Sequence, residues 1–175
     1  MDAERRLEAL GLPLPTLAET YRLDSSGARF VSHLAVGEVL YLSGTVPERE
    51  GVHVLAGVVG QDLTLEQGYE AARFAALSSI VALKHALGDL DRLVQVVQLT
   101  GYVNSAVGFN DQPRVINGAT DLLVEVFGSG GLGTRAAIGC RGLAYNASVE
   151  IVLVVRFDGG PVADPTPTIG SAKSA

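Results

Sequence analysis

The chain has 175 residues, of which 47% are hydrophobic and 18% are charged. This is the length and composition of one globular domain with a little extra chain, and its single cysteine, Cys140, excludes an internal disulfide. The net charge of −6, with no cluster of basic residues, argues against a nucleic-acid partner, because that affinity depends on neutralising phosphates.

Metal, cofactor and membrane motifs are also missing from the sequence. The three histidines, His33, His53 and His85, are scattered, which argues against a zinc site. The sequence contains neither a G-x-x-x-x-G-K-[ST] phosphate loop nor a G-x-G-x-x-G motif at the start of a helix. The longest aliphatic run, residues 151–155, is far shorter than the roughly 20 residues of a membrane helix, and the charged start does not look like a signal peptide. We therefore expect no metal, no organic cofactor, no membrane partner and a cytoplasmic location.

The first part of the chain predicts a lead-in followed by two strands. A short helix is expected over residues 2–10, and proline-containing extended chain continues it, so that residues 1–28 form an N-terminal lead-in. Apolar residues predict strands over 29–36 and 38–43, joined at Gly37.

The clearest predicted element is a helix over residues 65–87. Thr64 is a suitable N-cap, Gln67 occupies the capping-box position three residues later, and Gly88 marks the end. Its many alanine and serine residues predict a face that packs closely against a sheet.

The second part of the chain alternates strands and a helix. We predict, in order, a strand over 93–103, a helix over 112–127 capped by Asn110 or Asp111, a flexible glycine loop over 129–133, and strands over 134–141 and 147–157. The element order β-β-α-β-α-β-β indicates an α+β domain over residues 29–157, with both helices on one face of a mixed sheet. The tail, residues 158–175, is rich in proline, glycine, serine and alanine, which predicts a flexible segment.

Two charged residues stand out on the last two predicted strands. Arg135 opens an otherwise apolar strand, and Glu150 lies inside a β-branched run. A carboxylate buried there is costly unless it is paired, so Glu150 either faces solvent on an edge strand, pairs with an arginine, or serves a function. The functional interpretation is a carboxylate that activates water, with the arginine binding an anionic substrate.

The residues around these two positions resemble a known family. Gly133-Thr134-Arg135-Ala136-Ala137-Ile138-Gly139, followed 15 residues after the arginine by Glu150 in Val149-Glu150-Ile151, is similar to the C-terminal signature of the Rid family, also called YjgF or "endoribonuclease L-PSP". Upstream, the segment from Val36 to Pro47 with its Ser43-Gly44 pair resembles the hairpin of the same family, so that the resemblance covers about residues 29–156.

The resemblance implies a chorismate-mutase-like α+β fold that assembles as a homotrimer with sites between subunits. It also implies hydrolysis of a small imine or enamine acid to a keto acid and ammonia, without metal or cofactor. By position, Arg135 would bind the substrate carboxylate and Glu150 would hold the attacking water. Further substrate-binding positions would be Phe30, Ser43, Gly44 and Ala137. Apart from the resemblance, Asn117 is a candidate pocket residue because it is a polar amide that interrupts the apolar stripe of its predicted helix, although a core or surface role is the favoured interpretation.

Three positions depart from the family pattern, and one of them is Ala144, which replaces the proline of the turn. Ala137 stands where many deaminases have cysteine, and Phe30 stands where active members often have a tyrosine hydroxyl. A non-catalytic module that binds small carboxylates therefore remains an alternative, and a ribonuclease is a further, weaker one because the chain is acidic.

Spacing predicts that Arg135 and Glu150 do not act together within one subunit. In a hairpin that pairs residue 142 with residue 147, Glu150 lies opposite Gly139, and Arg135 is then about 13 Å farther along its strand at roughly 3.3 Å per residue. A three- or four-carbon acid cannot bridge that distance. We therefore expect a site shared between subunits, which cyclic symmetry would repeat at each interface.

Overall fold

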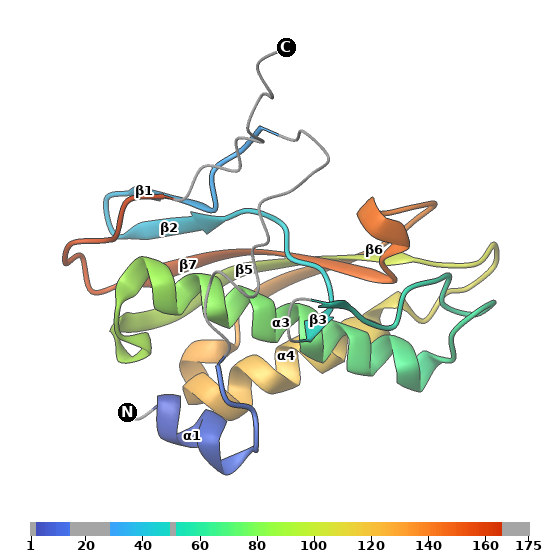
Figure 1. Ribbon diagram of the computed structural model, residues 1–175, viewed down its shortest axis with the longest axis horizontal. Coiled ribbons are helices and arrows are strands. Elements are labelled where there is room, and N and C mark those ends of the chain that lie inside the picture. The colour runs from blue at the N-terminus through green and yellow to red at the C-terminus, as the bar shows by residue number, and fades with distance from the viewer. Residues whose placement is uncertain (1–2, 15–28, 50–51, 166–175) are drawn as a thin grey trace.

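A computed structural model describes residues 3–14, 29–49 and 52–165 (Figure 1). The part of the lead-in over residues 15–28 and the last ten residues of the predicted tail lie outside the described residues. The main elements are α1 (Ala3–Ala9), β1 (His33–Val36), β2 (Val39–Leu42), β3 (Glu48–Arg49), β4 (Val52–His53), α3 (Leu65–Leu87), β5 (Leu93–Asn104), α4 (Gln112–Phe127), β6 (Thr134–Cys140) and β7 (Val149–Phe157). Short 3-10 helices lie at η1 (Leu90–Arg92), η2 (Gly128–Gly131) and η3 (Ala144–Asn146).

The main sheet has five strands in the order β1-β2-β7-β5-β6, and α3 and α4 cover one of its faces (Figure 1). Strand β6 runs parallel to β5, whereas all other neighbours are antiparallel. The predicted α+β architecture, with two helices on one face of a mixed sheet, is confirmed. Strands β3 and β4 form a separate two-stranded sheet between β2 and α3.

Helix α3 begins and ends where its sequence signals predict. Both bonds of the capping box are present, with Thr64 Oγ1 accepting from the Gln67 amide and Gln67 Oε1 accepting from the Thr64 amide. Gly88 ends the helix with a positive φ of 75°. The buried face is rich in alanine, which lets the helix lie close to its neighbours.

Helix α4 buries the apolar stripe that its spacing predicts: Val115, Ala119, Leu122, Leu123 and Val126 are all fully buried. Gly101 of β5 faces this helix, because a Cβ atom added there would lie within 2.9 Å of Ile116 Cγ2. Side chains alternate along β5, so Leu99, Gly101 and Val103 point to the helices. Thr100 and Tyr102 point to the uncovered face.

Two predictions about the second half are wrong. Strands β6 and β7 do not form a hairpin, because β7 lies between β2 and β5, and β6 lies beyond β5. The glycine loop is not open flexible chain either: Gly130 and Gly131 are buried, and a Cβ atom at residue 131 would lie 2.4 Å or less from the Leu123 carbonyl group. Glycine is required there because the loop backbone lies directly against the end of α4.

Both ends of the described chain pack on the domain. In α1, Ala3 and Leu7 are buried, and Arg6 donates to the Val126 carbonyl of α4 at 3.1 Å. Residues 158–165, which composition assigned to the flexible tail, make several hydrogen bonds to the domain. The backbone of Ala163 bonds to the Ala86 carbonyl and to the buried His33 ring. The tail prediction stays a prediction for residues 166–175.

Candidate functional site

Glu150 points away from the helices, toward the uncovered face of the sheet. Along β7, Val149 and Ile151 are fully buried against the helical layer, so the intervening Glu150 faces the other way. Its carboxyl group lies over Gly44, just past the end of β2. A Cβ atom on residue 44 would lie 2.9 Å from Glu150 Cδ and nearer still to Oε1. Residue 44 must therefore lack a side chain if the carboxylate is to occupy this position.

The Glu150 carboxylate is half-buried and has no hydrogen-bond or ion-pair partner among the described residues. Burial raises its pKa above the usual value for glutamic acid, because removal from water disfavours the charged form. Neither ordinary interpretation of this residue applies within the described chain: Glu150 is not on an edge strand and is not paired with an arginine. A group of this kind can accept a proton at an interior position.

Ser43, next to Gly44, organises the neighbouring chain. Its hydroxyl donates to the Val31 carbonyl at 2.6 Å, and its amide donates to the Ser32 carbonyl at 3.0 Å. These bonds hold the segment that carries Phe30, whose side chain is 40% exposed. The structure thus brings Ser43, Gly44 and Glu150 together, with Phe30 on the segment that Ser43 holds.

Arg135 lies on the outermost strand, β6, and turns toward α4. Its Nη1 atom donates to Asn117 Oδ1 at 2.7 Å and to Thr120 Oγ1 at 3.2 Å. Asn117 and Thr120 are three residues apart and so share one face of the helix. The Nε and Nη2 atoms have no partner in the described part of the chain, and this leaves one edge of the planar guanidinium available to a carboxylate.

Ala137 follows Arg135 on the same side of β6 and is half-buried against the core. Asn117 is exposed and contacts Arg135 through its side-chain oxygen, and its predicted role in substrate binding stays a prediction. Thr120 was not identified from the sequence. The signal that could have found it is its position three residues after Asn117, on the polar side of an amphipathic helix.

Arg135 and Glu150 lie on opposite faces of the sheet. The register pairs Arg135 with Leu99, which in turn pairs with Leu153, and both leucines are buried under the helices. Glu150 pairs instead with Tyr102, on the uncovered face. The predicted β6–β7 hairpin, from which the distance between Arg135 and Glu150 was derived, is wrong. The two side chains nevertheless belong to separate clusters within one subunit.

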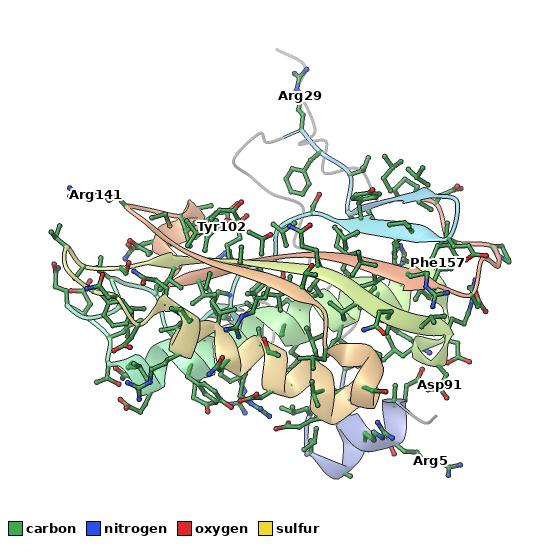
Figure 2. The ribbon with its side chains drawn as sticks, turned by 180° about the vertical axis from the view of Figure 1, so that it is seen from behind. Arg5, Arg29, Asp91, Tyr102, Arg141 and Phe157 are labelled. Carbon is green, nitrogen blue, oxygen red and sulfur yellow. The ribbon has the colours of Figure 1, made fainter. Side chains whose placement is uncertain are left out.

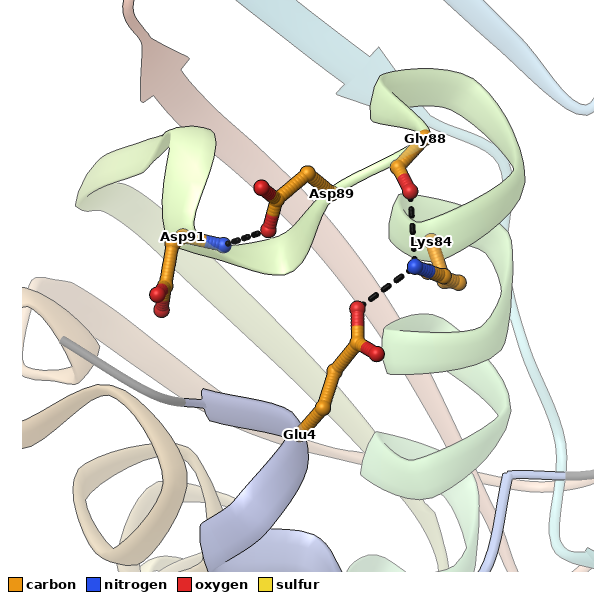
Figure 3. Close-up of a pocket in the computed structure, with 5 residues that line it drawn as sticks. All are labelled: Glu4, Lys84, Gly88, Asp89 and Asp91. Carbon is orange, nitrogen blue, oxygen red and sulfur yellow. Dashed lines mark hydrogen bonds and ion pairs between the residues drawn. The ribbon is translucent and has the colours of Figure 1, made fainter.

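A polar hollow lies elsewhere, between α1 and the end of α3 (Figure 3). Lys84 Nζ bridges Glu4 Oε1 at 2.5 Å and the Gly88 carbonyl at 2.7 Å. Asp89 accepts from the Asp91 amide at 2.9 Å, and Asp91 accepts from the Ala3 amide. These polar groups bond to one another, and the bonds connect α1 to the end of α3 and the segment after it. We therefore interpret the hollow as a structural contact that holds α1 in place.

Within the described ranges, no group of three or more histidine, cysteine, aspartate or glutamate side chains could hold a metal ion. No helix in the same part of the chain is both long and apolar enough to cross a membrane.

Residues 4–156 match the family described as "YjgF/chorismate_mutase-like, putative endoribonuclease". The chain belongs to this YjgF family. The match covers both clusters of the candidate site, so the resemblance seen in the sequence motifs is confirmed.

Relatives of similar length support the same YjgF assignment. Protein TCP17 of Trypanosoma cruzi is 37% identical over 153 residues, which is 87% of this chain and 92% of that protein. The crystal structure of Atu1372 from Agrobacterium tumefaciens has a TM-score of 0.80 at 36% identity, with 89% of this chain and 92% of that chain covered. A protein from Shewanella oneidensis, titled a "putative endoribonuclease", has a TM-score of 0.82 at 31% identity, with 90% of this chain and 100% of that chain covered.

Proposed function

We propose that this protein hydrolyses a small reactive imine or enamine acid to a keto acid and ammonia, in a homotrimer with sites between subunits. The observation that carries the proposal is the Glu150 carboxylate, which is half-buried and unpartnered over Gly44 and has a raised pKa. The available edge of Arg135 supplies the complementary function, because a guanidinium binds a carboxylate through two parallel hydrogen bonds.

The reaction needs little machinery, because the imine carbon is already electrophilic. Water adds to that carbon: a C–O bond forms, the π pair of the C=N bond moves to nitrogen, and Glu150 accepts the water proton. Glu150 then returns this proton to nitrogen, which gives a neutral carbinolamine. Glu150 next transfers the hydroxyl proton to the same nitrogen, and the C–N bond breaks as the C=O bond forms, so that the nitrogen leaves as ammonia. The balance is imine plus water to keto acid plus ammonia. The raised pKa of Glu150 favours this role, since a base works best when its pKa approaches the working pH.

The separation of the two clusters favours a shared site. Glu150 and Gly44 face the uncovered side of the sheet, whereas Arg135, Asn117 and Thr120 lie at the β6–α4 edge. The uncovered face also exposes large apolar side chains, including Leu34, Val36 and Ile138. Exposed apolar surface of this kind marks an interaction surface. A closed ring that stacks this face near a neighbour's β6 edge would unite the two clusters at every interface.

The test is an imine-quenching assay on the purified full-length protein. An amino acid oxidase generates the imine, and the remaining imine is trapped as a semicarbazone. We expect the wild type to accelerate imine loss, and Arg135→Lys and Glu150→Gln each to reduce the rate by about a hundredfold or more. Calorimetric binding of 2-keto acids without hydrolysis would instead favour the non-catalytic module. Cleavage of single-stranded RNA that depends on Glu150 would favour the ribonuclease alternative.

A further inference from the structure

Tyr102 is the strand residue directly paired with Glu150. The antiparallel register of β5 and β7 places the two residues opposite one another, and directly opposed Cβ atoms lie about 4.5–5.5 Å apart. Gly101 on one side of Tyr102 faces α4, and Val103 on the other side is fully buried, so Tyr102 itself faces the uncovered side of the sheet, as Glu150 does. Tyr102 is labelled in Figure 2.

The phenol of Tyr102 has no hydrogen-bond partner among the described residues, although the side chain is half-buried. Its apolar neighbours on this face are Ile138, its partner on β6, and Val152, which follows Glu150 on β7. Thr100, the polar neighbour on β5, already accepts a hydrogen bond from Gln98. Tyrosine hydroxyls in partly buried positions normally find a partner. Two side chains with unpaired polar groups, a carboxylate and a phenol, therefore extend from directly paired residues on the same face of the sheet.

We propose that the Tyr102 hydroxyl, together with Glu150, positions the water that attacks the substrate. This inference rests on the proposed imine hydrolysis. The two hydrogens of the attacking water point to Glu150 and to the phenol oxygen, so that the remaining lone pair is directed at the imine carbon. Glu150 takes one proton as the C–O bond forms, and the hydrogen bond to Tyr102 fixes the orientation of the water throughout that step. Phe30 carries no hydroxyl that could do this.

The test compares Tyr102→Phe with Tyr41→Phe in the imine-quenching assay. Tyr41 lies on the same face but pairs with Leu34 and Val154 instead of Glu150, so the control removes an identical oxygen atom away from the carboxylate. We expect Tyr102→Phe to lower kcat about tenfold or more, with KM and calorimetric binding of a 2-keto acid unchanged within twofold. Tyr41→Phe should retain the wild-type kcat.

A second variant separates positioning from packing. The second variant is Tyr102→Leu. If the hydroxyl positions the water, Tyr102→Phe already has a lowered kcat. The acidic limb of its pH–rate profile is retained, because Glu150 remains the base. If Tyr102 only fills space, Tyr102→Phe is normal and Tyr102→Leu is defective, which overturns the inference while the proposed hydrolysis stands. A wild-type protein that does not hydrolyse imines overturns both.

Discussion

At the scale of single residues, the most informative position is Gly44, because a carboxyl group occupies the volume of its missing side chain. A Cβ atom at this position would lie 2.9 Å from Glu150 Cδ, and Glu150 is the flexible partner that would move. Residue 44 therefore determines where the carboxylate can lie.

We expect Gly44→Ala to reduce imine hydrolysis at least tenfold, because the methyl group displaces the Glu150 carboxylate from its position. The measurement is a double-mutant cycle of kcat/KM with Glu150→Ala. If displacement is the cause, Gly44→Ala adds no further loss in the Glu150→Ala background. Independent, additive losses in the cycle would contradict this explanation, and thermal melts of all four proteins check that the fold is retained.

Burial of the Glu150 carboxyl also predicts a pH-dependent stability. Its pKa is raised in the folded state, so the folded protein binds this proton more tightly than the unfolded chain does. The contribution to stability is therefore largest at low pH and is lost as the pH rises through the raised pKa. We expect Glu150→Gln to be more stable than the wild type at pH 7.

This advantage of Glu150→Gln should disappear below about pH 4, where both states of the wild type hold the proton. Denaturant unfolding at several pH values measures it. Glu70→Gln, at an exposed position of α3, controls for the loss of one negative charge. An advantage that is independent of pH would exclude titration of Glu150 as the cause.

At the scale of elements, residues 158–165 act as a strap across the end of the sheet. Arg92 binds both carboxylate oxygens of Asp158, with its Nη2 2.9 Å from Oδ1, and also donates to the Pro161 carbonyl at 2.7 Å. Ala163 bonds to Ala86 and to His33. Such hydrogen bonds contribute on the order of 1 kcal/mol each.

We expect removal of residues 158–175 to lower the Tm by several degrees, at roughly 2–4 °C per kcal/mol for a chain of this size. Removal of residues 166–175 keeps every contact of the strap and serves as the matched control. Differential scanning calorimetry compares the three proteins. Equal melting temperatures for all three would mean that the strap adds no stability.

At the scale of the whole molecule, the separation of Arg135 from Glu150 predicts subunit complementation. Arg135→Ala subunits supply Glu150, and Glu150→Ala subunits supply Arg135. After equal mixing and random exchange, about a quarter of the interfaces in a cyclic ring combine both intact residues. We therefore expect recovery of about a quarter of the wild-type activity, and a mass consistent with three subunits by light scattering.

The matched control for this experiment replaces one partner by the double variant Arg135→Ala, Glu150→Ala. That subunit can complete no site when mixed with Glu150→Ala subunits, so no activity should return. Absence of recovery in the main mixture, with subunit exchange confirmed by mass spectrometry, would exclude a shared site.

The sequence by itself determined the elements whose signals are local. The capping box of Thr64 and Gln67, the stop at Gly88 and the apolar stripe of α4 each depend on residues within a few turns of one another, so they predicted both helices correctly. The family motifs likewise led to the YjgF assignment and nominated Arg135 and Glu150 as candidate site residues, because residue type and spacing are readable along the chain.

Only the tertiary structure decided which strands pair and which face each side chain takes. The local sequence does not distinguish a β6–β7 hairpin from a β6 strand that pairs with β5 in parallel. Strand pairing depends on how the whole sheet packs against α3 and α4. That choice placed Tyr102 beside Glu150 and turned Arg135 to α4. It also put Gly44 under the carboxylate, through pairing between residues more than a hundred positions apart.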